Sequence, residues 1–314
     1  EAKRVMISSA DGATNTINDG ESVIHFSDGA MPDQWVFRGE KLLTSCISEQ
    51  LVRGCVDNDA IKAYLSNDPS RVGNTWVSGW DIFHAAMEAK LASSVQKPDG
   101  SLAMSSQATY TVKTGAKILV KRNLRMGCDG VLGMELEFLV PEELDDLPRL
   151  GITVPLVAGF ENFHFFGKGP QETYWDRQAG GRTGFYEQSV TEQYFPYVMP
   201  QETGNHAGVQ MAAVDNGKVG LMVVSSGTDL EVSALHFTPE DFWKAHHINE
   251  LDARPETYLN IDIHQRGLGT RSCGEDTVDD CRIHAGWHRL ALKFFAYEVK
   301  AQADLMALAR QLQG

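Results

Sequence analysis

The sequence RLALKFFAYEV at residues 289–299 alternates apolar and polar side chains and is rich in aromatic and branched residues. This period of two is typical of a β-strand with one buried face. Similar runs occur at residues 110–113, 117–121 (KILVK), 134–140 (MELEFLV), 220–225 (GLMVVS) and 230–237. Turn pairs such as Asp129-Gly130 and Asn216-Gly217 separate them, as in antiparallel hairpins. We therefore predict an all-β fold, an antiparallel sandwich or barrel.

Two short helices are predicted against this β background. Thr238 supplies an N-cap hydroxyl, and Pro239 followed by two acidic residues suits a first helical turn. At the C-terminal end, the leucines of segment 304–314 share one helical face. A third segment, 80–91, has a helical composition but neighbours that equally favour a strand.

The chain of 314 residues is long enough to bury a sizeable core, and we expect residues 1–314 to form a single domain. Residues 141–148 (PEELDDLP) contain four acids and predict an exposed connection, so that two β-rich halves meet near residues 141–150. Charged runs of this kind usually face water, and we favour that role over an acidic binding motif.

The net charge of −14 repels nucleic-acid backbones and anionic membrane surfaces, which argues against both as partners. The sequence has no run of about 18 apolar residues, and its start lacks the apolar middle of a signal peptide. Five cysteines form no CxxC pair, which suits free thiols in a reducing compartment. We therefore expect a cytoplasmic protein.

Candidate chemical groups are mostly explained by structural roles. His246 and His247 lack the HExxH spacing of a helical zinc site, and we expect capping and core contacts instead. Paired carboxylates could hydrolyse glycosides, but nothing in the spacing places the acids of the motif-like segments across a sugar. We expect these acids to brace loops by accepting backbone N–H groups: Glu172, Asp176, Glu202 and Asp262. The aromatic residues between positions 160 and 197 could hold a carbohydrate or pack in the core.

Several segments, in order, resemble the C-terminal or small-chain domain of glycoside hydrolase family 2 β-galactosidases. They are LPRLG (147–151), FGKGPQETYWDR (166–177), YVMPQETGN (197–205), ALHFTPED (234–241) and LNID (259–262). RGCVDND at residues 53–59 is similar to the R-A-P-T-D-N-D segment of that family, and Trp76 and Trp80 fit the stretch that follows it. The resemblance covers about residues 10–300.

This resemblance implies an antiparallel supersandwich similar to galactose mutarotases, with a few short helices. In the family, both catalytic glutamates and the magnesium ligands lie in a separate (β/α) barrel, for which this chain is too short. The resemblance therefore implies no catalytic residue, no metal ligand and no cofactor in this chain, with magnesium and sodium expected in the barrel. Glu1, which is not a methionine, suggests a cut at a domain boundary.

The family mechanism is retaining hydrolysis of terminal β-D-galactosides such as lactose, through a galactosyl-enzyme. The resemblance implies that this chain is a domain or small subunit that shapes the active-site rim and is inactive alone. Its expected partners are the barrel domain or large subunit and a β-galactoside, in an oligomeric full enzyme.

One loop is expected to reach the substrate. In the family, the loop after the LNIDIHQRGLG strand often carries a tryptophan that stacks on the leaving sugar, and here Cys273 takes that position. The resemblance implies substrate contacts for Arg271, Ser272 and Cys273. Two other departures are Trp175 within YxDR and His206 where an arginine is usual.

An alternative is an autonomous aldose epimerase or carbohydrate-binding protein on a mutarotase-like fold. Such an epimerase needs a histidine and a glutamate in one pocket. The candidates are His236 or His264 near Glu172 or Glu202.

Overall fold

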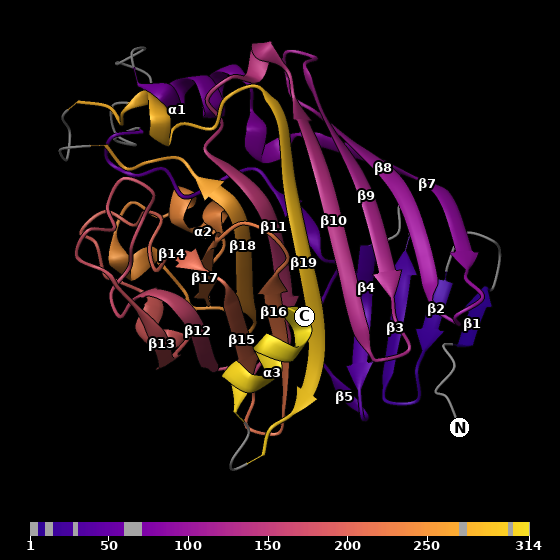
Figure 1. Cartoon of the computed structure of the whole chain (residues 1–314). Coiled ribbons are helices and arrows are strands. Elements are labelled where there is room, and N and C mark those ends of the chain that lie inside the picture. Colours follow the sequence, from indigo (N-terminus) through magenta and orange to yellow (C-terminus); the bar gives the residue numbers. More distant parts are fainter. Residues whose placement is uncertain are drawn as a thin grey trace.

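Three antiparallel sheets are seen in the computed structural model, which describes residues 6–9, 15–27, 31–59, 71–269, 275–300 and 304–313. The largest has nine strands in the described residues, in the order β13 (Arg182–Ser189), β12 (Asn162–Gly169), β15 (Met211–Asp215), β16 (Val219–Ser225), β19 (Gly286–Glu298), β10 (Val131–Val140), β9 (Lys117–Met126), β8 (Leu102–Thr111) and β7 (Ala86–Gln96). Figure 1 shows this sheet extending across the molecule.

Two smaller sheets complete the architecture. The first has the order β1 (Met6–Ser9), β2 (Asn15–Asn18), β3 (Ser22–Ser27), β4 (Met31–Phe37) and β5 (Glu40–Lys41). The second has the order β14 (His206–Val209), β17 (Leu230–Leu235), β18 (Thr257–Gln265), β11 (Arg149–Leu156) and β6 (Ser48–Gln50). One continuous cluster of buried apolar side chains includes members of all three sheets, so the predicted antiparallel all-β fold is confirmed.

The period-two pattern explains the strands of the large sheet. Along β10 every second side chain is buried, and β19 repeats this alternation from Leu290 onward, where it still pairs with β10. Residues 289–298 of the quoted run therefore lie in β19, and the other predicted runs overlap β8, β9, β10, β16 and β17.

Strand β16 differs, because all seven of its residues are buried. The helix α3 (Leu305–Gln313) covers the second face of this strand, and its buried residues Leu305, Ala309 and Leu312 share a cluster with Met222 and Val224. Figure 1 shows α3 lying over β15 and β16. A continuous apolar run thus becomes a strand that is covered on both sides, and the predicted terminal helix is confirmed.

The other predicted helix is α2 (Pro239–Lys244). The Thr238 side chain accepts from the backbone N–H of Asp241, whose carboxylate in turn accepts from the Thr238 N–H. This reciprocal capping box satisfies two free donors at the helix start. Segment 80–91 takes the strand alternative: one 3-10 turn, Ile82–His84, is followed by β7, which pairs with β8 along its length.

The remaining helical turns are short. They are α1 (Val72–Asn74), a π-helical turn at Thr75–Gly79, and 3-10 turns at Glu142–Leu144, Thr191–Gln193, Ile248–Glu250 and Asp279–Cys281. Among the described residues, no helix is long and apolar enough to cross a membrane. Within the part of the chain that the structure describes, the four cysteines Cys46, Cys55, Cys128 and Cys281 form no disulfide.

The acidic connection at residues 141–148 is only partly solvated. Glu142, Glu143 and Asp145 are exposed, whereas the Asp146 carboxylate turns inward and pairs with the buried guanidinium of Arg266. This acid serves an internal contact because a buried arginine requires a counter-charge. The nine-stranded sheet takes β7–β10 from before this connection and its other strands from after it.

A buried ion pair connects the large sheet to the sheet that contains β6. Glu49 of β6 accepts from Arg122 of β9 at 2.6 Å and from the Tyr110 hydroxyl of β8 at 2.7 Å. The pKa of Tyr110 is raised because burial and the Glu49 charge both disfavour its phenolate. This contact fixes the relative position of strands from two sheets.

Candidate functional site

Four of the motif segments, far apart in the sequence, meet around one pocket of about 410 Å³. Its described lining residues come from segments 53–59, 166–177, 197–205 and 264–269, and they are Val56, Asp57, Asn58, Tyr174, Arg177, Tyr197, Gln201, Glu202, Leu268 and Gly269. Leu268 and Gly269 directly precede residues 270–274, which contain the predicted substrate contacts. The motifs therefore mark one place in the fold.

Two buried arginines anchor the segments behind this pocket. Arg53 forms two hydrogen bonds to Asp59, at 2.9 and 2.7 Å, and also donates to the backbone carbonyls of Arg266 and Gly267. The second buried arginine is Arg266. The guanidinium groups of Arg53 and Arg266 both lie over the ring of buried Trp76, at 5.9 Å and 5.6 Å from the ring centroid. The aromatic face offsets part of the cost of burying two positive charges together.

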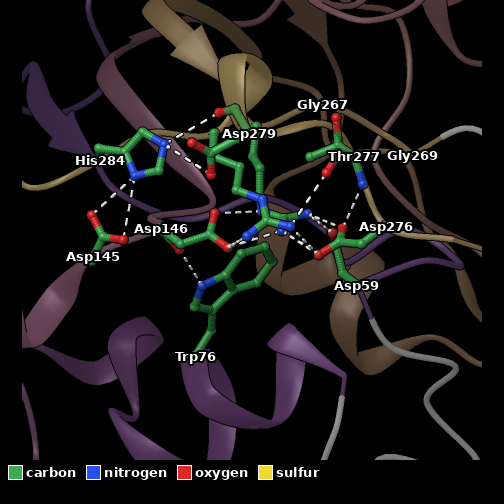
Figure 2. Close-up of polar contacts among 12 residues, drawn as sticks. Asp59, Trp76, Asp145, Asp146, Gly267, Gly269, Asp276, Thr277, Asp279 and His284 are labelled. Carbon is green, nitrogen blue, oxygen red and sulfur yellow. Dashed lines mark hydrogen bonds and ion pairs between the residues drawn. The ribbon is translucent and has the colours of Figure 1, made fainter.

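Arg266 has carboxylate partners on two sides. It donates to Asp146 at 2.5 and 2.9 Å and to Asp276 at 2.7 Å through two nitrogens. Figure 2 shows Asp146 and Asp276 on either side of one guanidinium group, with Trp76 beneath it. Burial alone would raise the pKa of Asp276, but its hydrogen bond and ion pair with Arg266 lower it. Through its contacts with Asp146 and Asp276, Arg266 joins segment 141–148 to the residues after position 274.

A third buried arginine, Arg149, starts strand β11. It donates to Asp262 at 2.9 Å and to Glu202 at 3.2 Å. Glu202 also accepts from the backbone N–H of Gly54 at 2.9 Å, so it connects the Arg149 network to the pocket. Burial raises the pKa of Asp262 to about 6, although the positive charge of Arg149 opposes this shift.

Glu172 is a second connecting carboxylate. It accepts hydrogen bonds from the side chains of Tyr174, Arg177, Tyr197 and Thr203 and from the backbone N–H of Gly204. Burial and the contact with Glu172 raise the pKa of Tyr197. The carboxylate therefore holds segments 166–177 and 197–205 together.

Asp176 braces the backbone at residues 268–269. Its carboxylate accepts from the N–H groups of Leu268 and Gly269 at 2.9 and 2.8 Å. Asp176, Glu172 and Glu202 thus confirm the expected loop-bracing role, since each accepts a backbone N–H. Asp262 differs, because its contacts are with the Arg149 side chain.

The predicted substrate contacts Arg271, Ser272 and Cys273 lie outside the described residues. Their assignment stays a prediction. The structure does describe both flanking residues, Gly269 and Glu275. A Cβ atom added to Gly269 would lie 3.0 Å from the carbonyl oxygen of Glu275, so the two flanks are close together.

The histidine–glutamate pairs required by the epimerase alternative are not formed. His236 contacts Glu161 at 2.7 Å, whereas His264 stacks on Trp175 at 3.8 Å and lies 3.5 Å from Glu231. In the described part of the chain, neither Glu172 nor Glu202 has a hydrogen bond or ion pair with a histidine.

Other candidates have structural roles. His246 and His247 are both exposed, so the expected core contacts are wrong. His247 occupies the N-cap position of the 3-10 turn Ile248–Glu250, but its side chain contacts the Glu250 carboxylate at 2.9 Å and caps no backbone N–H. The described residues contain no group of three or more His, Cys, Asp or Glu side chains arranged to hold a metal ion. His206 stacks on buried Phe165, and its Nε2 donates to the side-chain oxygen of Gln193 at 2.7 Å. Burial lowers the pKa of His206 to about 4, so it is a neutral core residue at pH 7.

The sequence motifs predict no role for Arg53, Arg149 or Arg266, which organise the site. The signal was available, because each arginine lies beside glycine or apolar residues in a motif segment. An arginine placed at a buried position needs carboxylate partners. The acids that provide them are up to 120 residues away in sequence, as for Arg266 and Asp146.

A family model described as "Beta galactosidase small chain" matches residues 19–295. The β-galactosidase of Actinobacillus pleuropneumoniae is 25% identical over 247 residues, which are 78% of this chain and 23% of that protein. That of Streptococcus thermophilus is 32% identical over 172 residues, or 54% of this chain and 15% of that protein.

A structural comparison gives the same fold class. The galactose 1-epimerase of Lactobacillus acidophilus NCFM matches with a TM-score of 0.52 and 9% identity, covering 95% of this chain and 99% of that one. This likeness concerns the fold alone and confirms the expected mutarotase-like architecture. The chain spans only 14% to 25% of the length of the curated relatives it matches. With the family model matched over most of its residues, the chain belongs to the β-galactosidase small chain family.

Proposed function

We propose that this chain is the rim-forming domain or small subunit of a retaining glycoside hydrolase family 2 β-galactosidase. In this proposal it binds a terminal β-galactoside such as lactose through Arg271, Ser272 and Cys273. The catalytic glutamates, together with magnesium and sodium, belong to a separate barrel domain or large subunit. The observation that carries the proposal is the meeting of four family motifs at one pocket that ends at Gly269.

The carboxylates at this pocket support a non-catalytic role. A retaining glycosidase needs two carboxyl groups about 5 Å apart with a sugar between them. Glu172 is instead occupied by five donors, and Glu202 is buried against Gly54 and Arg149. Both groups are committed to holding loops, so the hydrolytic pair has to come from elsewhere in the enzyme.

Exposed apolar side chains beside the pocket support a partner domain on this side. Phe195 is 56% exposed and Val198 is 90% exposed. The Phe195 ring lies 4.7 Å from that of Tyr197, which lines the pocket. Large exposed apolar side chains beside a pocket are a feature of interaction sites. We place the barrel domain here, in a cytoplasmic and oligomeric enzyme.

We expect the purified chain to release no nitrophenol from a nitrophenyl β-galactoside. Mixing it with the barrel-bearing part of the same enzyme should raise hydrolysis by at least about 100-fold over that part alone, because a rim that positions substrate contributes to catalysis. Absorbance during turnover measures both results.

A matched sample lacking residues 270–274 controls for nonspecific stabilisation of the barrel. Galactoside hydrolysis by the isolated chain would overturn the proposal, as would a mixture no more active than the barrel alone. An anomer-exchange measurement by NMR tests the epimerase alternative, for which interconversion of galactose anomers must exceed the rate in buffer.

A further inference from the structure

Asp176 bonds to the backbone on one side of residues 270–274 and to a side chain on the other side. One carboxylate oxygen accepts from the Leu268 N–H at 2.9 Å. The second oxygen accepts from the Gly269 N–H at 2.8 Å and also from the Thr277 hydroxyl at 2.8 Å. One side chain therefore connects the residues before position 270 to those after position 274.

The position of Asp176 is itself fixed. Tyr174 and Arg177 exchange backbone hydrogen bonds of 3.0 and 2.9 Å, which leaves Trp175 and Asp176 as the two central residues of a tight hairpin turn. The neighbouring Trp175 ring stacks on His264 at 3.8 Å. A carboxylate on such a turn loses little conformational freedom when it accepts its three hydrogen bonds.

The glycines around this carboxylate explain the sequence Gly267-Leu268-Gly269. A Cβ atom on Gly267 would lie 2.2 Å from the Thr277 hydroxyl oxygen and 2.6 Å from an Asp176 oxygen. Gly269 has a φ of +91°, and a Cβ atom there would lie 2.3 Å from the Asn58 amide nitrogen. Only glycine permits this close approach. The local backbone is thus built around the Asp176 contacts.

A second connection joins the same two flanks. Arg266, before the segment, pairs with Asp276, after it, and Figure 2 shows Gly267, Thr277 and Asp276 close together around this contact. The Arg266 pair is therefore expected to keep the flanks near each other without Asp176. Loss of the Asp176 contacts should alter the position of the flanks and leave the fold intact.

From these contacts we infer that Asp176 is a positioning residue that sets the spacing of the flanks of residues 270–274 and thereby the affinity for the leaving part of a β-galactoside. The effect on affinity rests on the proposed function. The hydrogen bonds that Asp176 accepts from Leu268, Gly269 and Thr277 are independent of the proposed function. Asp176 acts through the backbone and has no contact with the reacting atoms.

The structural part is tested by amide hydrogen exchange on the full β-galactosidase that contains this chain. In Asp176→Asn, one amide oxygen can still accept from Leu268, but an NH₂ group then faces the Gly269 N–H. Exchange at Leu268 and Gly269 should accelerate about tenfold or more, while strands β11 and β18 keep their protection. Thr277→Val, which removes only the hydroxyl contact, should accelerate it less. Unchanged exchange at both amides would overturn the inference.

The functional part is tested by kinetics on the same enzymes. For nitrophenyl β-galactoside, Asp176→Asn should raise KM about three- to tenfold with kcat changed less than about twofold. For β-galactosyl fluoride, which has no bulky leaving group, KM should stay within about twofold. Asp280→Asn removes the same charge at an exposed position nearby and should match the wild type.

The outcomes separate the two proposals. Equal changes in KM for both substrates, or a loss confined to kcat, would contradict the positioning role. A wild-type assembly without β-galactosidase activity would contradict the proposed function, whereas the hydrogen-exchange result would still decide whether Asp176 fixes the flanking residues.

Discussion

Arg149→Met is expected to destabilise this protein by about 3–5 kcal/mol at pH 7. Arg149 is fully buried and provides the positive charge for two buried carboxylates, Asp262 at 2.8 Å and Glu202 at 3.2 Å. Methionine approximates the volume of the arginine side chain but leaves both carboxylates without a counter-charge. Urea unfolding, followed by tryptophan fluorescence, measures the difference from the wild type.

Arg289→Met is the matched control. This arginine pairs with Glu135 at 2.7 Å, but both side chains are largely exposed, at 57% and 40%. Exposed pairs contribute about 0–1 kcal/mol, and the control should lie in that range. A loss below about 1 kcal/mol for Arg149→Met would contradict the assignment of this network as the buried support of the site.

Asp262→Asn is expected to change the pH dependence of stability by up to about 3 kcal/mol. The pKa of Asp262 is raised by burial from 3.8 to about 6 in the folded protein. Between these values the folded state binds a proton that the unfolded state does not bind. Stability from this group is therefore fully present below pH 3.8 and is lost as the pH rises through 6. Asparagine removes the titration.

The measurement is the difference in unfolding free energy between wild type and variant, taken from urea titrations at pH 4, 5, 6 and 7. The unfolding free energy of the wild type should increase relative to that of Asp262→Asn as the pH falls. Asp241→Asn is an opposite-sign control, because hydrogen bonds and the charge of Arg254 outweigh burial and lower the pKa of Asp241. The difference in unfolding free energy between the wild type and Asp241→Asn should therefore decrease as the pH falls. A flat difference for Asp262→Asn would show that this carboxyl does not titrate with folding.

Much of the fold follows from local patterns. Period-two runs such as residues 134–140 place alternate side chains in the core, and the Thr238 cap fixes the start of α2. Segment 80–91 was ambiguous because its composition suits a helix, and only pairing with β8 makes it a strand. The sheet order was not predictable, since it depends on contacts between residues far apart in sequence.

The site was predictable as a set of motifs and not as a network. The resemblance placed RGCVDND, GPQETYWDR and the RGLG segment in one family, and the structure brings them to one pocket. The partnership of Asp176 with Leu268 spans 92 residues, which no local pattern reveals. The inward turn of Asp146 was missed because its neighbours Glu143 and Asp145 are exposed acids, as in an ordinary surface loop.

The central claim is that this chain shapes a β-galactosidase site but provides no catalytic carboxylate. A 2-deoxy-2-fluoro-β-galactoside with a good leaving group traps the galactosyl-enzyme of a retaining enzyme on its nucleophile. Peptide mass spectrometry of the labelled full enzyme then locates the sugar. We expect the label on a glutamate outside these 314 residues. A fluorogalactosyl group on Glu172, Glu202 or any other carboxylate of this chain would contradict it.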